Sequence, residues 1–354
     1  MRISENRQLV EVLYILGAGA SYASSLPSSG VGPFTTPLDA DFTARIGSLK
    51  VDRPEWVEAT RKHCLNSWKD HRSFESSGLE TAVLRQLGHL EFLRAIHPRR
   101  ARENPTAGEW LLDIAHLISF VLNPCRQNTQ KLFDRFADLA FPQGADYADC
   151  RNRVITFNYD SLLDDVLLKR FTPQHLYFYK IKGRSAAGEH VDRVLAPLYL
   201  KLHGSINWRC SADDFRHVLR NANPANQNLV DLGEIRFDDG EIPRPQDDDC
   251  PLIVPPLPTK PISTVSIFQY LWTRAYEYLY TAQKLVICGY SLPPADQMAV
   301  SMFSNFHNRD LQEVTIIDPS AAVLTRWRDL LRRSSVKVGN WRYCETFKEY
   351  LEGA

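Results

Sequence analysis

Residues 154–168 read VITFNYDSLLDDVLL, and this stretch decides the fold class. Its first half is a short β-branched run that favours a strand, and its second half spaces leucine and valine as on one face of a helix. The stretch therefore predicts a strand, a sharp turn and a helix. Asn158, Asp160 and Ser161 stand at the junction, where their side-chain oxygens can cap the helix or face a ligand at the carboxyl end of the strand.

The same arrangement recurs along the chain. Apolar strand candidates end in glycine, histidine or aspartate at four further places, namely 9–16, 194–202, 284–288 and 313–317. A helical pattern covers 268–282, and further helices lead to a short strand at 335–338 and a closing helix at 346–351. Strands that alternate with helices are typical of a parallel sheet with right-handed crossovers. We therefore expect an α/β fold with a Rossmann-like parallel sheet flanked by helices.

Two long segments fall outside this alternation. Between about 54 and 140, apolar residues recur at helical spacing without a strand pattern, which predicts a large helical insertion. Residues 211–250 are polar, with Asn, Asp and Gly in clusters, so the segment 211–262 is predicted as a loop-rich excursion that consists of loops or a small hairpin. The prolines near its end exclude that part from the interior of a sheet.

The composition limits the classes of partner. The 42 basic and 42 acidic residues cancel, so the formal net charge is zero. This balance is unfavourable for binding a nucleic-acid backbone, and we predict no direct nucleic-acid binding. The four arginines of the segment 326–333 form the best basic cluster, and a solvated helix face explains it more simply.

The seven cysteines are scattered singly, and none forms a Cys-x-x-Cys pair. This pattern indicates reduced thiols in a cytoplasmic protein, and it gives no zinc-site spacing, so we expect no metal. The N-terminus does not resemble a signal peptide, and no apolar run is long enough to span a bilayer. We therefore expect no membrane association.

The first strand candidate leads directly into Gly17-Ala18-Gly19-Ala20-Ser21. Two glycines at this point let backbone N–H groups approach a diphosphate closely at the start of a helix. The third glycine of the dinucleotide fingerprint is missing, so a simple tight turn is an equally good interpretation.

His203 follows a strand candidate and precedes Gly204. A histidine in this place can act as a base or contact a ligand, because the glycine after it leaves room for a substrate. Taken alone, a hydrogen-bonded structural histidine is the more common case.

Five strand ends thus carry glycine or polar residues, at 17–21, 158–160, 203–205, 289–291 and 318. In an open parallel sheet the carboxyl ends of the strands lie along one edge. Any one of these groups can be a cap or a turn, but five of five favour a shared ligand site.

The motifs GAGAS, TFNYD, LHGS, CGYSLPPAD and IIDPS, in this order, resemble the Sir2 family, and closely its prokaryotic branch linked to phage defence. They cover about half of the chain, and the segment 54–140 is outside the match. The resemblance implies a single Sir2-like NAD-binding domain over 1–354 and implies NAD⁺ as the substrate. Asp41 and Phe42 stand where the family has an Asp-Phe pair that covers nicotinamide, although Thr43 replaces the arginine that follows it.

The resemblance also implies roles for individual residues. Those implied to hold the NAD⁺ diphosphate are Gly17, Ala18, Gly19 and Ser21. Those implied to face the nicotinamide ribose and carboxamide are Thr156, Asn158 and Asp160. Gly289 and Ser291 are implied to meet the phosphate and ribose, and Asp318 the adenosine end. His203 matches the family's catalytic histidine, and Asn158 is expected to act with it.

One departure separates the possible activities. Classical sirtuin deacylases carry a four-cysteine zinc module that helps to form the acyl-lysine groove, and this chain has no such spacing. We therefore expect an NAD⁺ glycohydrolase that releases nicotinamide and ADP-ribose. The alternatives are an NAD-dependent protein deacylase or ADP-ribosyltransferase, and a module that senses NAD or ADP-ribose without chemistry.

The branch that the chain resembles is typically silent until triggered. The resemblance implies an antiviral effector that depletes NAD⁺, assembles as a homo-oligomer and works with a partner such as a HerA-type ATPase or an Argonaute-like protein. No sensor domain is recognisable in the sequence, so we expect the helical segment 54–140 to contact the activator.

Overall fold

The computed structural model describes most of the chain. The described residues are 9–26, 34–48, 78–96, 107–127, 131–142, 144, 149–177, 197–220, 232, 235–237, 249–257, 260, 264–293, 296–309, 311–334 and 336–353.

Within this part of the chain, six parallel strands form the main sheet. The strands are β1 (Val10–Leu16), β2 (Arg153–Thr156), β3 (Tyr199–Lys201), β7 (Ala282–Cys288), β8 (Glu313–Ile317) and β9 (Asn340–Cys344). Their order is β3-β2-β1-β7-β8-β9, so the chain extends the sheet first to one side of β1 and then to the other. This is the strand order of doubly wound Rossmann-type sheets, and the predicted fold class is confirmed.

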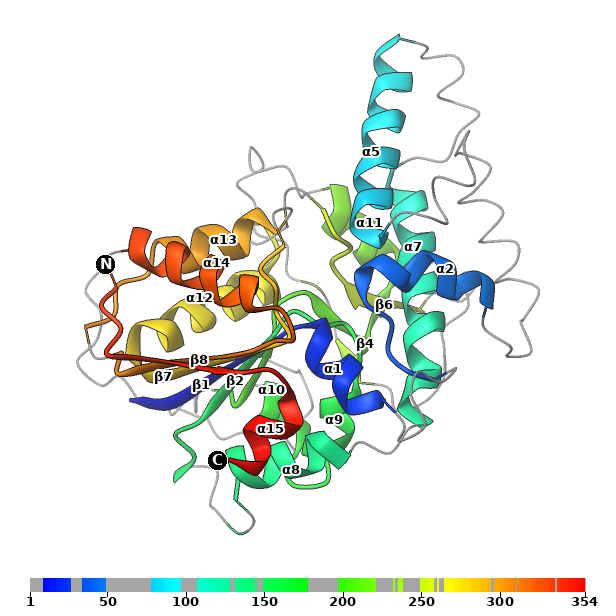
Figure 1. Ribbon diagram of the computed structural model, residues 1–354. Coiled ribbons are helices and arrows are strands. Elements are labelled where there is room, and N and C mark those ends of the chain that lie inside the picture. The colour runs from blue at the N-terminus through cyan, green and yellow to red at the C-terminus, as the bar shows by residue number, and fades with distance from the viewer. Residues whose placement is uncertain are drawn as a thin grey trace, which may run out of the picture.

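The strands are apolar because the sheet is covered on both faces. Most residues of β1, and all those of β2 and β3, are buried. Figure 1 shows α12 (Ser266–Thr281), α13 (Gln297–Ser304) and α14 (Ala321–Arg333) over one face. The other face is covered by α8 (Lys131–Ala140) and α15 (Phe347–Glu352), which contact each other. The helix predicted over 268–282 is thus confirmed as α12.

The opening stretch has the predicted order of elements. Strand β2 ends at Thr156, a turn follows, and α9 (Leu162–Leu167) begins after Ser161. Two further short helices are α1 (Ala18–Ser25) and α10 (Pro173–Tyr177).

Two strand predictions need correction. Strand β3 covers only Tyr199–Lys201 of the expected 194–202, because Pro197 has no N–H for the ladder, and 194–196 lie outside the described residues. The strand expected at 335–338 is wrong, since β9 begins at Asn340. Strand β9 is an edge strand in which Cys344 is the buried residue, so its sequence has no apolar run. Val336 and Val338, which suggested a strand, pack on the core from a connecting segment.

The segment 211–262 contains strands and a helix besides loops. Together with β4 (Gly204–Ser211), the strands β5 (Arg236–Phe237) and β6 (Asp249–Ile253) form an antiparallel sheet in the order β5-β4-β6, and α11 (Ala212–Arg220) follows β4. Strand β6 includes Pro251 and lies at an edge of the described antiparallel sheet. An edge position is where a strand can accommodate proline.

The described parts of 54–140 are helical, and 54–77, 97–106 and 128–130 lie outside the described residues. The helices are α5 (Leu79–Ile96), α7 (Ala107–Leu122), the 3-10 helix η1 (Asn123–Gln127) and α8. They are preceded by α2 (Asp39–Ser48), which contacts α5 and α7. No helix in the described ranges is both long and apolar enough to cross a bilayer.

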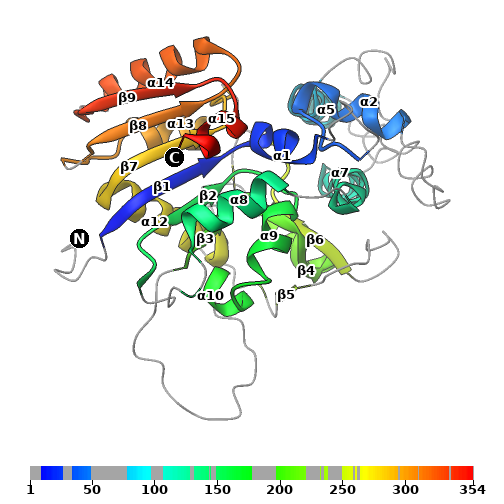
Figure 2. The ribbon, with the colours of Figure 1, turned by 60° about the horizontal axis from the view of Figure 1, so that its bottom comes forward.

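These additional elements lie beyond one edge of the main sheet. Figures 1 and 2 show α1, α2, α5, α7 and the sheet of β4–β6 past the carboxyl ends of the parallel strands. The register makes those ends level, because Leu16 pairs with Thr156 on one side and with Cys288 on the other, and Cys288 pairs with Ile317. The five strand ends singled out from the sequence therefore share one edge.

Candidate functional site

The glycine turn after β1 is in close contact with the turn after β7. The N–H of Gly17 donates to the Cys288 carbonyl at 3.0 Å, and the N–H of Gly19 donates to the Gly289 carbonyl at 3.0 Å. A Cβ on Gly17 would lie 2.4 Å from the Gly289 oxygen, and one on Gly289 would lie 2.3 Å from the Ala20 nitrogen. The glycines are thus needed for contact between the two turns, and the N–H of Gly19 is not free for a phosphate.

Asn158 links the end of β2 to this turn. Its Nδ2 donates to the Gly17 carbonyl and to Ser21 Oγ, each at 2.9 Å. A carbonyl can only accept, so the contact with Gly17 fixes which way the amide points. Both amide hydrogens are therefore used inside the protein, and Oδ1 is the atom with which Asn158 can meet a ligand.

Thr156 supports the same turn from inside. Its hydroxyl donates to the Leu16 carbonyl at 3.1 Å and accepts from the N–H of Asn158 at 3.1 Å. Because Thr156 is 1% exposed, it positions Asn158 and presents no surface to a ligand in this arrangement.

Asp160 and Ser21 are also engaged internally. Asp160 Oδ1 accepts from the N–H of Leu162 at 3.1 Å, at the first turn of α9, and the Ser21 hydroxyl bonds to the same carboxylate. Burial raises the pKa of Asp160, although Lys201 and the Ser21 hydroxyl oppose that shift. Asp160 is therefore the residue whose side chain caps the start of α9. The hydroxyl of Ser161 has no hydrogen-bond partner among the described residues.

Behind this turn lies a buried ion pair that the sequence did not reveal. Lys201 Nζ lies 2.7 Å from Asp164 Oδ2, and neither side chain is exposed. The same carboxylate accepts from the hydroxyls of Tyr177 and Tyr199 and from Asn207 Nδ2. This network joins α9, α10, β3 and β4, and it holds the strand end that carries His203.

His203 lies in an aromatic pocket. Its ring contacts Phe157, Tyr159 and Trp272, with centroid distances of 5.3, 6.0 and 6.3 Å, and the residue is 6% exposed. The next residue, Gly204, has φ +76°, and a Cβ there would lie 2.1 Å from the Leu252 oxygen. The glycine after His203 therefore brings β4 close to β6.

The surroundings of His203 change its acid–base behaviour. Burial and, after it, the nearby Lys260 ammonium lower the pKa of His203 to about 3, although Asp296 and the Phe157 backbone oppose that shift. The ordinary histidine pKa of about 6.5 therefore does not apply to His203. The ring is neutral at neutral pH.

Three residues at His203 were absent from the predicted site. Asp296 Oδ2 lies 3.5 Å from His203 Nε2, and it accepts from the Tyr290 hydroxyl at 3.0 Å. Lys260 Nζ lies 3.8 Å from the other oxygen of Asp296. Asp296 and Tyr290 belong to the CGYSLPPAD motif that the sequence analysis quoted, so the motif was the available signal, whereas nothing in the sequence singled out Lys260.

Glu80 brings the helical segment to the same cluster. Its charge acts on Lys260, Asp296 and Tyr290, and its N–H donates to Asp39 Oδ1 at 2.9 Å. Burial, together with the neighbouring carboxylate of Asp39, raises the pKa of Glu80. Helices α2 and α5 therefore cover the edge of the sheet next to His203.

The remaining predicted residues lie at the same edge but are not joined to this cluster by hydrogen bonds in the described structure. Ser291 and Ala18 are exposed. Asp318 follows β8, its Oδ1 accepts from the N–H of Ser320 at 2.9 Å, and burial raises its pKa. Of the Asp-Phe pair in the first part of the chain, Asp41 is exposed and Phe42 is buried in α2.

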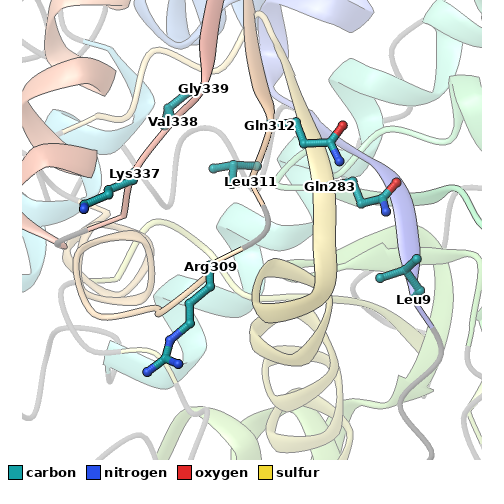
Figure 3. Close-up of a pocket in the computed structure, with 8 residues that line it drawn as sticks. All are labelled: Leu9, Gln283, Arg309, Leu311, Gln312, Lys337, Val338 and Gly339. Carbon is teal, nitrogen blue, oxygen red and sulfur yellow. The ribbon is translucent and has the colours of Figure 1, made fainter.

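A surface cavity of about 600 Å³ lies elsewhere, at the opposite, amino-terminal edge of the sheet (Figure 3). It is lined by Leu9, Gln283, Arg309, Leu311, Gln312, Lys337, Val338 and Gly339. The predicted site residues are not part of it. In the described portion of the chain, no group of three or more His, Cys, Asp or Glu side chains is arranged to hold a metal ion.

Comparison with models of known protein families gave no match, and no curated protein matches the chain.

Proposed function

We propose that this protein is an NAD⁺ glycohydrolase that cleaves NAD⁺ to nicotinamide and ADP-ribose. The observation that carries the proposal is the position of Asn158 between the glycine turn and the His203 strand end. Both of its amide hydrogens are bound to Gly17 and Ser21, which leaves a fixed acceptor, Oδ1, at the carboxyl edge of a Rossmann-type sheet. The motif resemblance to the Sir2 family supports the same substrate.

Cleavage of NAD⁺ needs groups that orient the ribose, activate water and hold the diphosphate. Breaking the bond between nicotinamide and C1′ builds positive charge on the ribose, so the enzyme must orient the sugar and provide a base for water. Asn158 Oδ1 can accept a hydrogen bond from a ribose hydroxyl or from the attacking water. The start of α1, where Ala18 is exposed, is suited to the diphosphate, whose binding energy then helps to fix C1′.

His203 is suited to the base role because its ring is neutral and its Nε2 has no hydrogen-bond partner among the described residues. A buried base with a depressed pKa is weak until a proton donor and a counter-charge lie beside it. Since His203 is 6% exposed, a substrate must displace neighbouring side chains to reach it. We therefore expect low activity of the isolated chain and activation by assembly or by a partner protein, as in a defence effector that depletes NAD⁺.

The test is release of nicotinamide and ADP-ribose from NAD⁺, measured with and without the proteins encoded next to it. We expect Asn158→Ala and His203→Ala each to abolish release while the thermal unfolding midpoint shows that the fold persists. His307→Ala and Asn340→Ala are the matched controls, because both residues are exposed and outside the site. Turnover like that of the wild type in both site variants would refute the assigned roles.

The same assay separates the alternatives. A deacylase or ADP-ribosyltransferase would consume NAD⁺ only with an added acyl-lysine peptide or acceptor protein. A sensor would bind labelled NAD⁺ and yield no product after long incubation of the activated assembly.

A further inference from the structure

The geometry around His203 contains an unusual contact between two acceptors. His203 Nε2 faces Asp296 Oδ2 at 3.5 Å, and within the described structure Nε2 has no hydrogen-bond partner. Both side chains are more than nine-tenths buried. A pair of buried polar atoms that face each other without a hydrogen bond is unfavourable unless a proton lies between them.

The proton on the histidine ring can be placed. A hydrogen bond to the Phe157 backbone raises the pKa of His203, so it favours the protonated ring, and the ring is therefore the donor. Because Nε2 is the nitrogen without a partner, the donor is Nδ1. The neutral ring thus carries its hydrogen on Nδ1 and directs the lone pair of Nε2 toward Asp296.

The charges that face His203 come from several elements. Asp296 precedes α13, Lys260 follows β6, and Glu80 and Asp39 belong to α5 and α2. Tyr290 donates to Asp296, and Tyr159 donates to the Val254 carbonyl, so both hydroxyls are already engaged. Asp296 is therefore the acidic group that directly faces Nε2, and Lys260 is the cation that opposes protonation of the ring.

We propose that Asp296 is the positioning residue of His203: it fixes the orientation of the ring and stabilises the imidazolium that forms when Nε2 accepts a proton from a hydroxyl group that lies beside the two side chains. This proposal rests on the proposed NAD⁺ cleavage. Lys260, on the other oxygen of Asp296, keeps the carboxylate ionised.

The proton balance is simple. The water oxygen forms a bond to C1′ as the bond from C1′ to the nicotinamide nitrogen breaks, and nicotinamide leaves neutral with the electron pair. The water proton moves to Nε2, and the imidazolium is held by Asp296 until the proton passes to solvent. The products are nicotinamide, ADP-ribose and one proton.

The first experiment uses NMR of isotope-labelled histidine side chains in the full-length protein, with the His203 signals identified by their loss in His203→Gln. For the wild type we expect a neutral ring with its hydrogen on Nδ1 at neutral pH. In Asp296→Asn the new amide can donate to Nε2, so the Nε2 resonance will move. In Lys260→Met the opposing charge is lost, so His203 will become protonated at higher pH than in the wild type, and adding Asp296→Asn will reverse that change.

The second experiment measures nicotinamide release by the activated assembly. We expect Asp296→Asn to lower kcat at least about tenfold with little change in KM, because the base and not the binding of NAD⁺ is affected. Asp296→Glu, which keeps the charge, should recover part of the loss.

The two experiments separate the two proposals. If His203 responds to Asp296→Asn in the NMR spectra but no form of the protein releases nicotinamide, the positioning of His203 stands and the proposed function fails. If the His203 resonances are the same in Asp296→Asn and the wild type, or if Asp296→Asn keeps the wild-type kcat in an active assembly, the role of Asp296 is refuted.

Discussion

Lys201 and Asp164 form an ion pair of 2.7 Å in which neither side chain is exposed to solvent. Lys201 also donates to the Asp160 carbonyl, and two tyrosine hydroxyls donate to Asp164, so the polar groups of the pair are widely satisfied. The pair fastens α9 to the strand that leads to His203. Its main effect is therefore to fix the relative positions of the Asn158 turn and the histidine.

Lys201→Met removes the cation and leaves a buried carboxylate without its counter-charge. We expect the free energy of unfolding to fall by about 3 to 5 kcal/mol, since breaking one side of a buried pair is far more harmful than losing an exposed one. Chemical denaturation measures the change. The control is Lys348→Met, whose exposed partner Glu352 lies 3.8 Å away and whose loss should cost less than about 0.5 kcal/mol. Equal stability of the two variants would contradict the prediction.

Gly289→Ala tests the contact between the two turns at the strand ends. Gly289 has φ +59°, and a Cβ would lie within 2.5 Å of the Gly19 backbone, so both strain and overlap oppose the substitution. We expect a loss of at least about 1 to 3 kcal/mol in thermal or urea unfolding. Gly88→Ala in α5 is the opposite case, because no described atom lies within 4 Å of its Cβ position, and it should stabilise by about 0.5 to 1 kcal/mol. A harmless Gly289→Ala would show that the turns do not touch.

The closing helix offers a test of local stability. Thr346 Oγ1 accepts from the N–H of Glu349 at 3.1 Å, and the Glu349 carboxylate accepts from the N–H of Thr346, which completes a capping box. Thr346→Ala should lower stability by about 1 kcal/mol. Ser320 stands at the start of α14 without a side-chain capping bond in the described structure, so Ser320→Ala should change stability little. The prediction fails if the two substitutions have the same effect in denaturant titrations.

The buried His203 should make the fold sensitive to acid. Its pKa is about 3 in the folded protein and about 6.5 when unfolded, so between these values the unfolded chain binds more protons. The contribution of His203 is complete above pH 6.5 and is lost as the pH falls toward 3, at up to ~1.4 kcal/mol per pH unit. Asp39 and Glu80, whose pKa values are raised, act in the opposite direction in part of this range.

The difference between the wild type and His203→Gln isolates this term, since the other groups are present in both proteins. Denaturation curves recorded from pH 7 down to about 4 should show a flatter pH dependence for His203→Gln. His307→Gln, at an exposed position, should keep the wild-type slope. Parallel curves for the wild type and His203→Gln would mean that the ring is protonated in the folded state.

The sequence was enough to predict the parallel sheet, because strands buried on both faces must be apolar along their whole length. It also identified Asn158 and His203 at strand ends that the register makes level. Strand β9 escaped detection because it is an exposed edge strand without an apolar run. The hydrogen bonds of Ser21 with Asn158 and of Gly19 with Gly289 could not be predicted from the sequence, because they join segments far apart in the chain.

The tertiary structure alone decided what surrounds the two site residues. Lys201 and Asp164 lie 37 residues apart in a strand and a helix, and neither position differs in sequence from an ordinary surface charge. Lys260 and Asp296 meet His203 only because β6 and the turn before α13 reach the same edge of the sheet. Propensity and periodicity are local and therefore visible in the sequence, but a pKa depends on burial and on charges brought together by folding.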